Sequence, residues 1–173
     1  MIRFEDEWEF ENGEKYTGIA QIYRHSDGYP EAIIEDLMEL FSLLKKTQSY
    51  RDASYTASQF IFTDKLRTAK MTMSYHLNKK PSEITIDDIL ECNINQPMFL
   101  LGHGVENPSE GIYGDEEYLY IVKVSENKWY VKVSEHCGFP RYGEGIKYAF
   151  EKARWEFEGS LEEAYEKYCK KER

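Results

Sequence analysis

The chain begins with an alternation of apolar and polar side chains. Within residues 2–10, large apolar residues occupy alternate positions and charged residues lie between them. The apolar residues are Ile2, Phe4, Trp8 and Phe10. This two-residue period predicts a half-buried strand, and Asn12-Gly13 is typical of the tight turn that joins the strands of a hairpin. A second strand is therefore expected over residues 16–25.

At Pro30 the period changes to that of a helix, and proline suits the first position of a helix. Apolar residues then recur every three or four positions, at Ile33, Ile34, Leu37, Leu40, Phe41 and Leu44. The acidic residues among them are expected on the opposite, solvent-facing side. These are Glu31, Glu35, Asp36 and Glu39. The pattern predicts an amphipathic helix whose C-terminal end is complemented by Lys45 and Lys46.

Residues 52–79 contain neither glycine nor proline and predict a long helix that ends near Asn78. The apolar stripe expected for this helix consists of Phe62, Leu66, Ala69, Met73 and Leu77. Pro81 stops the helix. Residues 85–90 then predict a short helix with Thr85 as its N-cap.

The second half of the chain begins with residues 93–115, which are rich in glycine and proline and predict an ordered surface loop of functional length. Residues 118–124 and 129–133 are rich in β-branched and aromatic side chains and predict a second hairpin. A helix is expected over residues 144–157, with Gly159 as its end.

The last predicted element is a helix that begins after Ser160, because Ser160 and Glu163 have the spacing of a capping box. The two hairpins and the helices between and after them indicate one α+β domain over residues 1–173. We expect one mostly antiparallel sheet of about four strands, covered by helices on one side.

Composition narrows the class of protein. The 173 residues carry a net charge of −10, and 15% of them are aromatic, which compensates for a small aliphatic content. A net negative charge disfavours unselective binding to a nucleic-acid backbone. Residues 45–80 are locally basic, with 8 basic and 2 acidic side chains. This segment is either a solvated helical face or a patch that binds an anion or nucleic acid.

The sequence shows no clear targeting signal and no cysteine motif. No apolar run approaches the roughly 18 residues that would span a bilayer, and the acidic residues near the start do not fit a signal peptide. A cytoplasmic protein without a membrane anchor is expected. The three cysteines, Cys92, Cys137 and Cys169, are far apart and predict neither a zinc site nor a disulfide framework.

The segment from Ile22 to Glu31, with the sequence Ile-Tyr-Arg-His-Ser-Asp-Gly-Tyr-Pro-Glu, has a distinctive strand–turn–helix pattern. It resembles a motif in a family of small bacteriophage, bacterial and archaeal proteins of uncharacterised function, in which a strand runs into His-x-Asp-Gly-Tyr-Pro and then a helix. Residues 114–120, Gly-Asp-Glu-Glu-Tyr-Leu-Tyr, are similar to the segment that opens a later hairpin in that family. The resemblance implies an intracellular, mobile-element-associated protein and no particular reaction or cofactor.

The residues that could take part in catalysis or binding lie mainly in the predicted turns and loops. His25 can titrate near neutral pH, and Asp27 would lie on the same face of an extended chain, where it could orient the imidazole. Further candidates are His103, Asp115, Glu117 and His136. Two of these histidines could act as base and acid in phosphodiester cleavage. Lys65, Arg67 or Lys70 would then hold the phosphate.

A structural interpretation of the turn stands beside the catalytic one. Asp27 then forms a turn through its side chain, Gly28 adopts a left-handed conformation, Tyr29 packs on the sheet and His25 bonds to a neighbouring backbone group. In the same way, Gly102-His103-Gly104 is too short for a phosphate-binding loop and is more simply part of a surface loop.

Three functional hypotheses follow. The leading one is a small non-enzymatic protein that binds another macromolecule, a protein in preference to nucleic acid. Its expected surface is the turn and the 93–115 loop, with binding residues His25, Asp27, Gly28, Tyr29, Asp115 and Glu117. The alternative is a nuclease-like phosphodiesterase that uses His25, Asp27, His103 and His136, with no cofactor or metal site predicted. The third is a homodimer that buries aromatic surface.

Overall fold

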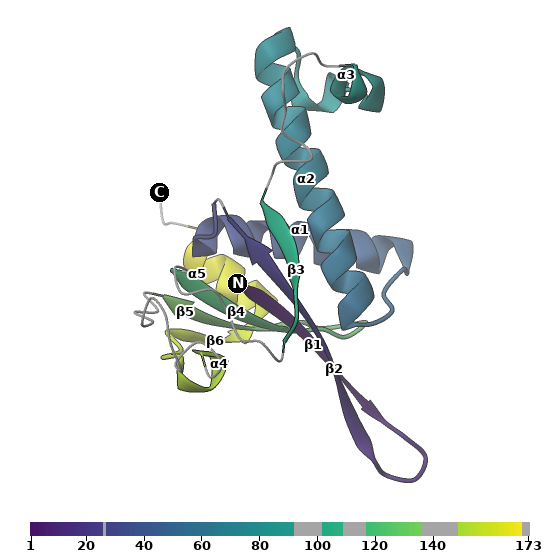
Figure 1. Cartoon of the computed structure of the whole chain (residues 1–173), viewed down its shortest axis with the longest axis vertical. Helices are drawn as coiled ribbons and strands as arrows, with labels where there is room; N and C mark the ends of the chain where they lie inside the picture. The colour runs from purple at the N-terminus through teal and green to yellow at the C-terminus, as the bar shows by residue number, and fades with distance from the viewer. Residues whose placement is uncertain (26, 92–101, 109–116, 136–148, 171–173) are drawn as a thin grey trace.

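The structure is a computed structural model of the chain that describes residues 1–25, 27–91, 102–108, 117–135 and 149–170 (Figure 1). Its strands are β1 (Ile2–Glu9), β2 (Lys15–Arg24), β3 (His103–Glu106), β4 (Tyr118–Lys123), β5 (Tyr130–Glu135) and β6 (Phe157–Ser160). Its helices are α1 (Pro30–Thr47), α2 (Ala53–Leu77), α3 (Ile86–Leu90), α4 (Ala149–Lys152) and α5 (Leu161–Tyr168), with a 3-10 turn, η1 (Pro81–Glu83).

The α+β class is confirmed, but the sheet differs from the one expected. In the described part of the chain, six strands form one sheet in the order β3-β2-β1-β4-β5-β6. The prediction of about four strands is wrong because β3 and β6 add an edge on each side of the two hairpins. The sheet is also mixed, since β1 and β4 run parallel, with Ile2 opposite Tyr120.

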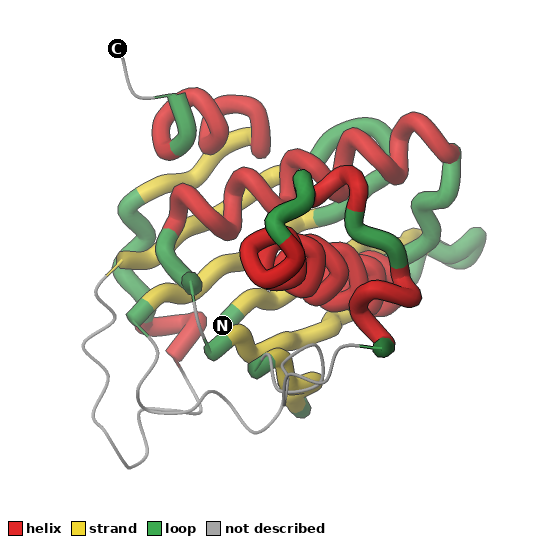
Figure 2. Tube along the Cα trace, turned by 90° about the horizontal axis from the view of Figure 1, so that it is seen from above, coloured by secondary structure: helices red, strands yellow, loops and turns green. Residues whose placement is uncertain are grey.

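Helices α1, α2 and α5 lie together on one face of the sheet (Figure 2). Tyr120 and Val122 of β4 point into the core beneath these helices, whereas Leu119 lies in a second cluster with Phe150 of α4. Because neighbouring residues of a strand point to opposite faces, α4 lies against the other face. The expectation that helices cover only one side is therefore wrong.

The main core combines aromatic rings from the sheet with the aliphatic stripe of α1. Trp129, Tyr120, Phe4 and Phe60 are fully buried. The rings of Phe41 on α1 and Trp129 lie 5.2 Å apart between centroids, and the Trp129 indole donates a 3.0 Å hydrogen bond to the Ser125 carbonyl. Aromatic residues thus supply the area that the small number of aliphatic residues cannot.

The helix starts predicted at Pro30, Thr85 and Ser160 and the end of α2 predicted near Asn78 are confirmed. Gln48 follows α1 as its C-cap in a left-handed conformation. Asp52 caps α2 by accepting a 2.9 Å hydrogen bond from the Tyr55 amide. Thr85 and Ser160 cap α3 and α5, each through a capping box.

The buried face of α2 is not the apolar stripe that its sequence suggests. Phe62 is 64% exposed and Leu77 is also exposed, while Ala69 and Met73 are buried as expected. The residues that α2 buries are Ala53, Thr56, Ala57, Phe60, Asp64, Ala69 and Met73. The helix is therefore rotated relative to the expected stripe, so that Asp64 points inward.

Two segments have a different secondary structure from the one predicted. The helix expected over residues 144–157 is α4 alone in its described part, and Phe157 and Gly159 lie in β6, which pairs with β5. Within the loop expected over residues 93–115, residues 103–106 form β3. Both are strands of four residues, which are too short for a periodic pattern to distinguish them from a loop or a helix end.

The rotation of α2 gives a direct test. Phe60→Ala should lower the free energy of unfolding by about 3–5 kcal/mol, because the ring is fully buried and its loss leaves a cavity. The matched change on the exposed side, Phe62→Ala, should stay within about 0.5 kcal/mol of the parent protein. Denaturant unfolding of both variants measures this difference. Equal losses of unfolding free energy in the two variants would show that the buried face of α2 is assigned incorrectly.

Candidate functional site

The turn between β2 and α1 begins directly after Arg24 and ends at Pro30. Asp27 has a φ of 54°, the left-handed conformation that aspartate tolerates better than most residues. The Tyr120 hydroxyl donates a 2.6 Å hydrogen bond to the Gly28 carbonyl, which ties the turn to β4. Burial raises the pKa of Tyr120 far above its usual value, so the hydroxyl remains protonated and able to donate.

His25 lies at the surface beside the segment that leads into β3. Its Nδ1 atom is 2.7 Å from the Tyr23 hydroxyl, and its backbone amide donates a 2.7 Å hydrogen bond to the Gly102 carbonyl. A Cβ atom at position 102 would collide with the His25 side chain, so glycine allows this close approach. Gly102, which lies inside the predicted 93–115 loop, is thereby attached to the turn.

The turn borders an open cavity of about 390 Å³ between β2, β4 and the start of α1. Five of the six predicted binding residues line it, namely His25, Asp27, Gly28, Tyr29 and Glu117. Tyr23, Tyr118 and Tyr120 line it as well. The described parts of the two segments singled out in the sequence, residues 22–31 and 114–120, therefore meet at one site. The sixth residue, Asp115, lies outside the described residues.

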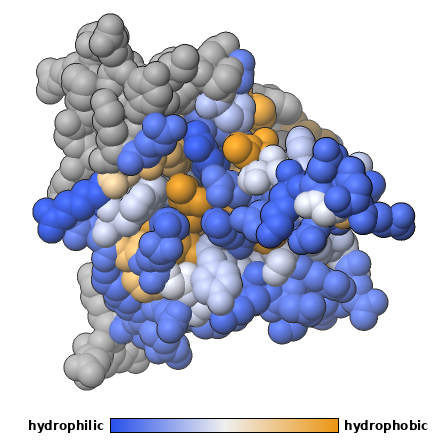
Figure 3. All heavy atoms as spheres, turned by 90° about the horizontal axis from the view of Figure 1, so that it is seen from below, coloured by the Kyte–Doolittle hydropathy of each residue, from blue (hydrophilic) through white to orange (hydrophobic). Residues whose placement is uncertain are grey.

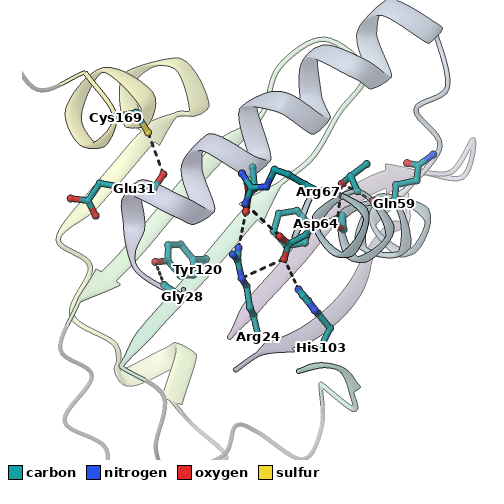
Figure 4. Close-up of polar contacts among 12 residues, drawn as sticks. Arg24, Gly28, Glu31, Gln59, Asp64, Arg67, His103, Tyr120 and Cys169 are labelled. Carbon is teal, nitrogen blue, oxygen red and sulfur yellow. Dashed lines mark hydrogen bonds and ion pairs between the residues drawn. The ribbon is translucent and has the colours of Figure 1, made fainter. Parts of the chain in front are cut away.

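Beneath the turn is a cluster of charged side chains, which we call the ion cluster (Figure 4). Its members are Arg24 of β2, Asp36 of α1, Asp64 and Arg67 of α2, and His103 of β3. The side chains of Arg24, Asp36, Asp64 and His103 are at most 6% exposed, and that of Arg67 is 30% exposed. Four separate elements of the fold thus contribute charge to one buried point.

The contacts of the ion cluster alternate between cation and anion. Arg24 Nη1 lies 2.7 Å from Asp36 Oδ2, and Arg24 Nε lies 3.4 Å from Asp64 Oδ2. Arg67 contacts both carboxylates, Asp36 through Nη1 and Asp64 through Nη2 at 3.5 Å. His103 Nε2 is 2.6 Å from Asp64 Oδ2. Since a carboxylate only accepts hydrogen bonds, the imidazole donates to it from Nε2.

The two aspartates of the ion cluster have different pKa values. Burial raises the pKa of Asp36 to about 6, against the lowering by Arg67 and Arg24. Burial also raises the pKa of Asp64, but the hydrogen bond from His103 and the charges of Arg24 and Arg67 outweigh this effect and hold it below its usual range. Asp64 is therefore the more permanent negative charge of the pair.

The described residues of the phosphodiesterase hypothesis have different surroundings in the structure. His25 and Asp27 line the 390 Å³ cavity, and His103 does not. The Nε2 atom of His103 is bound to Asp64 in the buried ion cluster, and Arg67 is paired with two aspartates. His136 lies outside the described residues. Among the residues that the structure describes, no group of three or more potential ligands could hold a metal ion.

A second open cavity, of about 570 Å³, lies on the other side of the turn, between α1 and α2. Arg24, Asp27 and Tyr29 line this cavity as well as the first one. Arg67 reaches it from the edge of the ion cluster, and Glu31 and Glu35 add negative charge. The turn therefore forms a ridge between two hollows, with Tyr29 45% exposed on it.

Sequence reasoning missed most of the ion cluster. Asp36 was expected on the solvent side of its helix, and the structure buries it instead. Asp64 and Arg67 are three residues apart on one helix, the spacing of a surface ion pair. The available signal was Asp64 itself, one of two carboxylates within the basic segment 45–80 and one turn after Phe60. The presence of a carboxylate in a basic segment does not indicate whether its side chain is buried.

Comparison with protein-family models, with curated proteins and with solved structures finds no match to the chain. The resemblance of the turn motif to the uncharacterised phage, bacterial and archaeal family therefore stays a prediction. Among the described helices, none is both long and apolar enough to cross a bilayer.

Removal of one cation from the ion cluster should lower the stability of the folded protein. Arg24→Met leaves two buried carboxylates with one arginine fewer, and the free energy of unfolding should fall by about 3–5 kcal/mol. The control is Arg154→Met, which removes an exposed arginine 3.3 Å from Glu156 and should cost at most about 1 kcal/mol. Urea unfolding at pH 7 measures both. An Arg24→Met variant as stable as the control would contradict the buried cluster.

Proposed function

We propose that the chain is a non-enzymatic binding protein that recognises another protein through the ridge, of which the structure describes His25, Asp27, Gly28 and Tyr29. The observation that carries this proposal is that the two segments of distinctive sequence line one open cavity, although about 90 residues separate them in the chain. Pockets that combine aromatic side chains with a few convergent polar groups are the usual sites of ligand recognition.

The side chains around the ridge favour a protein partner with a basic contact surface. Asp27 and Glu117 border the first cavity, and Glu31 and Glu35 border the second. The two arginines nearby, Arg24 and Arg67, are paired with Asp36 and Asp64 in the ion cluster. Carboxylates thus dominate the charge that a partner would meet, which disfavours a phosphate backbone. Complementary charge also speeds association.

Tyr29 is the aromatic anchor of the proposed surface. It is exposed, borders both cavities and directly precedes α1. Tyrosine is enriched where proteins bind one another, because its ring buries apolar area and its hydroxyl still finds a polar partner. The rigid elements beneath the turn would hold this ring in place before binding, which reduces the entropy lost on association.

A photo-crosslinking experiment tests the proposal. The photoreactive residue p-benzoylphenylalanine replaces Tyr29 in one preparation and Tyr75, an exposed tyrosine near the end of α2, in another. We expect a discrete protein crosslink in the native cell from position 29 and none from position 75. The crosslinked protein is then purified, and its affinity for the full chain is measured by calorimetry.

Charge variants decide whether the ridge makes the contact. Asp27→Asn with Glu117→Gln removes two charges, and asparagine tolerates the left-handed backbone at position 27. We expect affinity to fall on the order of tenfold, with a weaker salt dependence. The control, Asp87→Asn with Glu91→Gln near α3, changes the net charge equally and should bind normally. Equal loss in both variants, or identical crosslinks from positions 29 and 75, would contradict the proposal.

A further inference from the structure

A different cavity lies at the opposite end of β2 from the ridge, where the β1–β2 hairpin projects beyond the rest of the sheet (Figure 1). The cavity has a volume of about 430 Å³. Three aromatic side chains of the hairpin line it, namely Trp8, Phe10 and Tyr16, and each is about half exposed. Trp8 and Tyr16 are directly opposite each other on the paired strands. We call this site the hairpin cavity.

The face of the molecule on which the hairpin projects is mostly hydrophilic. Figure 3, seen from below, shows orange and pale residues in a central band that is flanked by blue ones. The aromatic residues of the hairpin cavity are likewise accompanied by charged ones, since Asp6, Glu9 and Asp52 are part of its lining. This mixture of rings and carboxylates distinguishes the cavity from a plain apolar contact surface.

Asp6 is the unusual member of this lining. Its side chain is buried, with the residue only 4% exposed, and the structure gives it no ion-pair partner among the described residues. Oδ2 accepts a 2.6 Å hydrogen bond from the Trp8 indole, while Oδ1 has no hydrogen-bond partner in the described part of the chain. A buried carboxylate without a counter-ion is costly, so a cation bound nearby would stabilise it.

The backbone is adapted to this carboxylate. Gly18 lies opposite Asp6 in the hairpin, and a Cβ atom at position 18 would collide with Asp6 Oδ1. Glycine in the interior of a strand weakens the strand, and here it leaves the space that the carboxylate occupies. Asp6 can therefore occupy this position only because residue 18 is a glycine. The pairing of the two strands does not by itself require a glycine there.

The charged side chains that line the cavity, Asp6, Glu9 and Asp52, are all acidic. Burial raises the pKa of the nearby Tyr50 to about 12, and the charges of Asp6 and Asp52 contribute to the rise. Asp52 is the N-cap of α2 and borders the cavity. The hairpin cavity thus combines partly exposed aromatic rings with carboxylates, the two kinds of group that attract an organic cation.

We propose that the hairpin cavity binds the guanidinium group of an arginine side chain presented by another protein. Guanidinium is planar and weakly hydrated, so it stacks on aromatic rings and enters a partly buried site more readily than the strongly hydrated lysine ammonium. Trp8 and Tyr16 supply the rings, and Asp6 supplies the charge. The site is independent of the ridge.

The test uses three short peptides and the full chain labelled with nitrogen-15. The peptides are acetyl-Gly-Arg-Gly-amide, its lysine counterpart and its citrulline counterpart, which has nearly the shape of arginine without the charge. The reporter is the Trp8 indole N–H resonance. We expect the arginine peptide to shift it saturably, the lysine peptide to bind several-fold more weakly and the citrulline peptide to leave it unchanged.

Two variants test the assigned residues. Asp6→Asn keeps the shape of the side chain and should weaken arginine binding on the order of tenfold, as expected when a charge-assisted contact is lost. Tyr16→Ala changes an exposed residue, leaves Asp6 in place and should also weaken binding. Phe62→Ala on α2 is the aromatic control and should bind normally. Circular dichroism verifies the fold of each variant.

The proposal has clear contrary outcomes. Equal binding of the arginine and citrulline peptides would remove the role of charge, and a preference for lysine would remove the guanidinium assignment. Normal binding by both folded variants would place the arginine elsewhere on the protein. The absence of any saturable shift of the Trp8 resonance would reject the site.

Discussion

The buried ion cluster is the interaction on which the rest of the structure depends. Arg24 ends β2, Asp36 follows on α1, and their ion pair closes the chain around the turn between them. Asp64 and Arg67 attach α2 to the same point, and His103 attaches β3. Buried charges are stable only when their partners are all present. The cluster therefore requires four elements to meet in one arrangement.

The position of the ridge follows from this arrangement. The described residues of the turn are fixed by the ion pair of Arg24, by the Tyr120 hydrogen bond to Gly28, and by the contact between His25 and Gly102. A loop held in this way presents Tyr29 and Asp27 in one conformation between two cavities. The hairpin cavity at the other end of β2 is built differently, since a single buried carboxylate among aromatic rings defines it.

The parts of the fold that could be predicted from the sequence are those with local causes. The Asn12-Gly13 hairpin, the start of α1 at Pro30 and the cap at Ser160 each depend on neighbouring residues. The short strands β3 and β6 exist because distant partners pair with them, and four residues carry too little pattern to reveal this. Within the candidate site, the turn could be predicted because its sequence motif is unusual. Asp36 and Asp64 could not, because their burial depends on cations contributed by other elements.

The most direct test of this account is a carbon-13 NMR titration of the two aspartate carboxyl groups in the folded protein. The buried cluster predicts that Asp36 titrates with a midpoint near pH 6, whereas Asp64 stays ionised to a pH below its usual range. Both groups titrating together near the value of about 3.9 for an exposed aspartate would contradict it. In that case the charges would lie in water, and the ridge would have no rigid support.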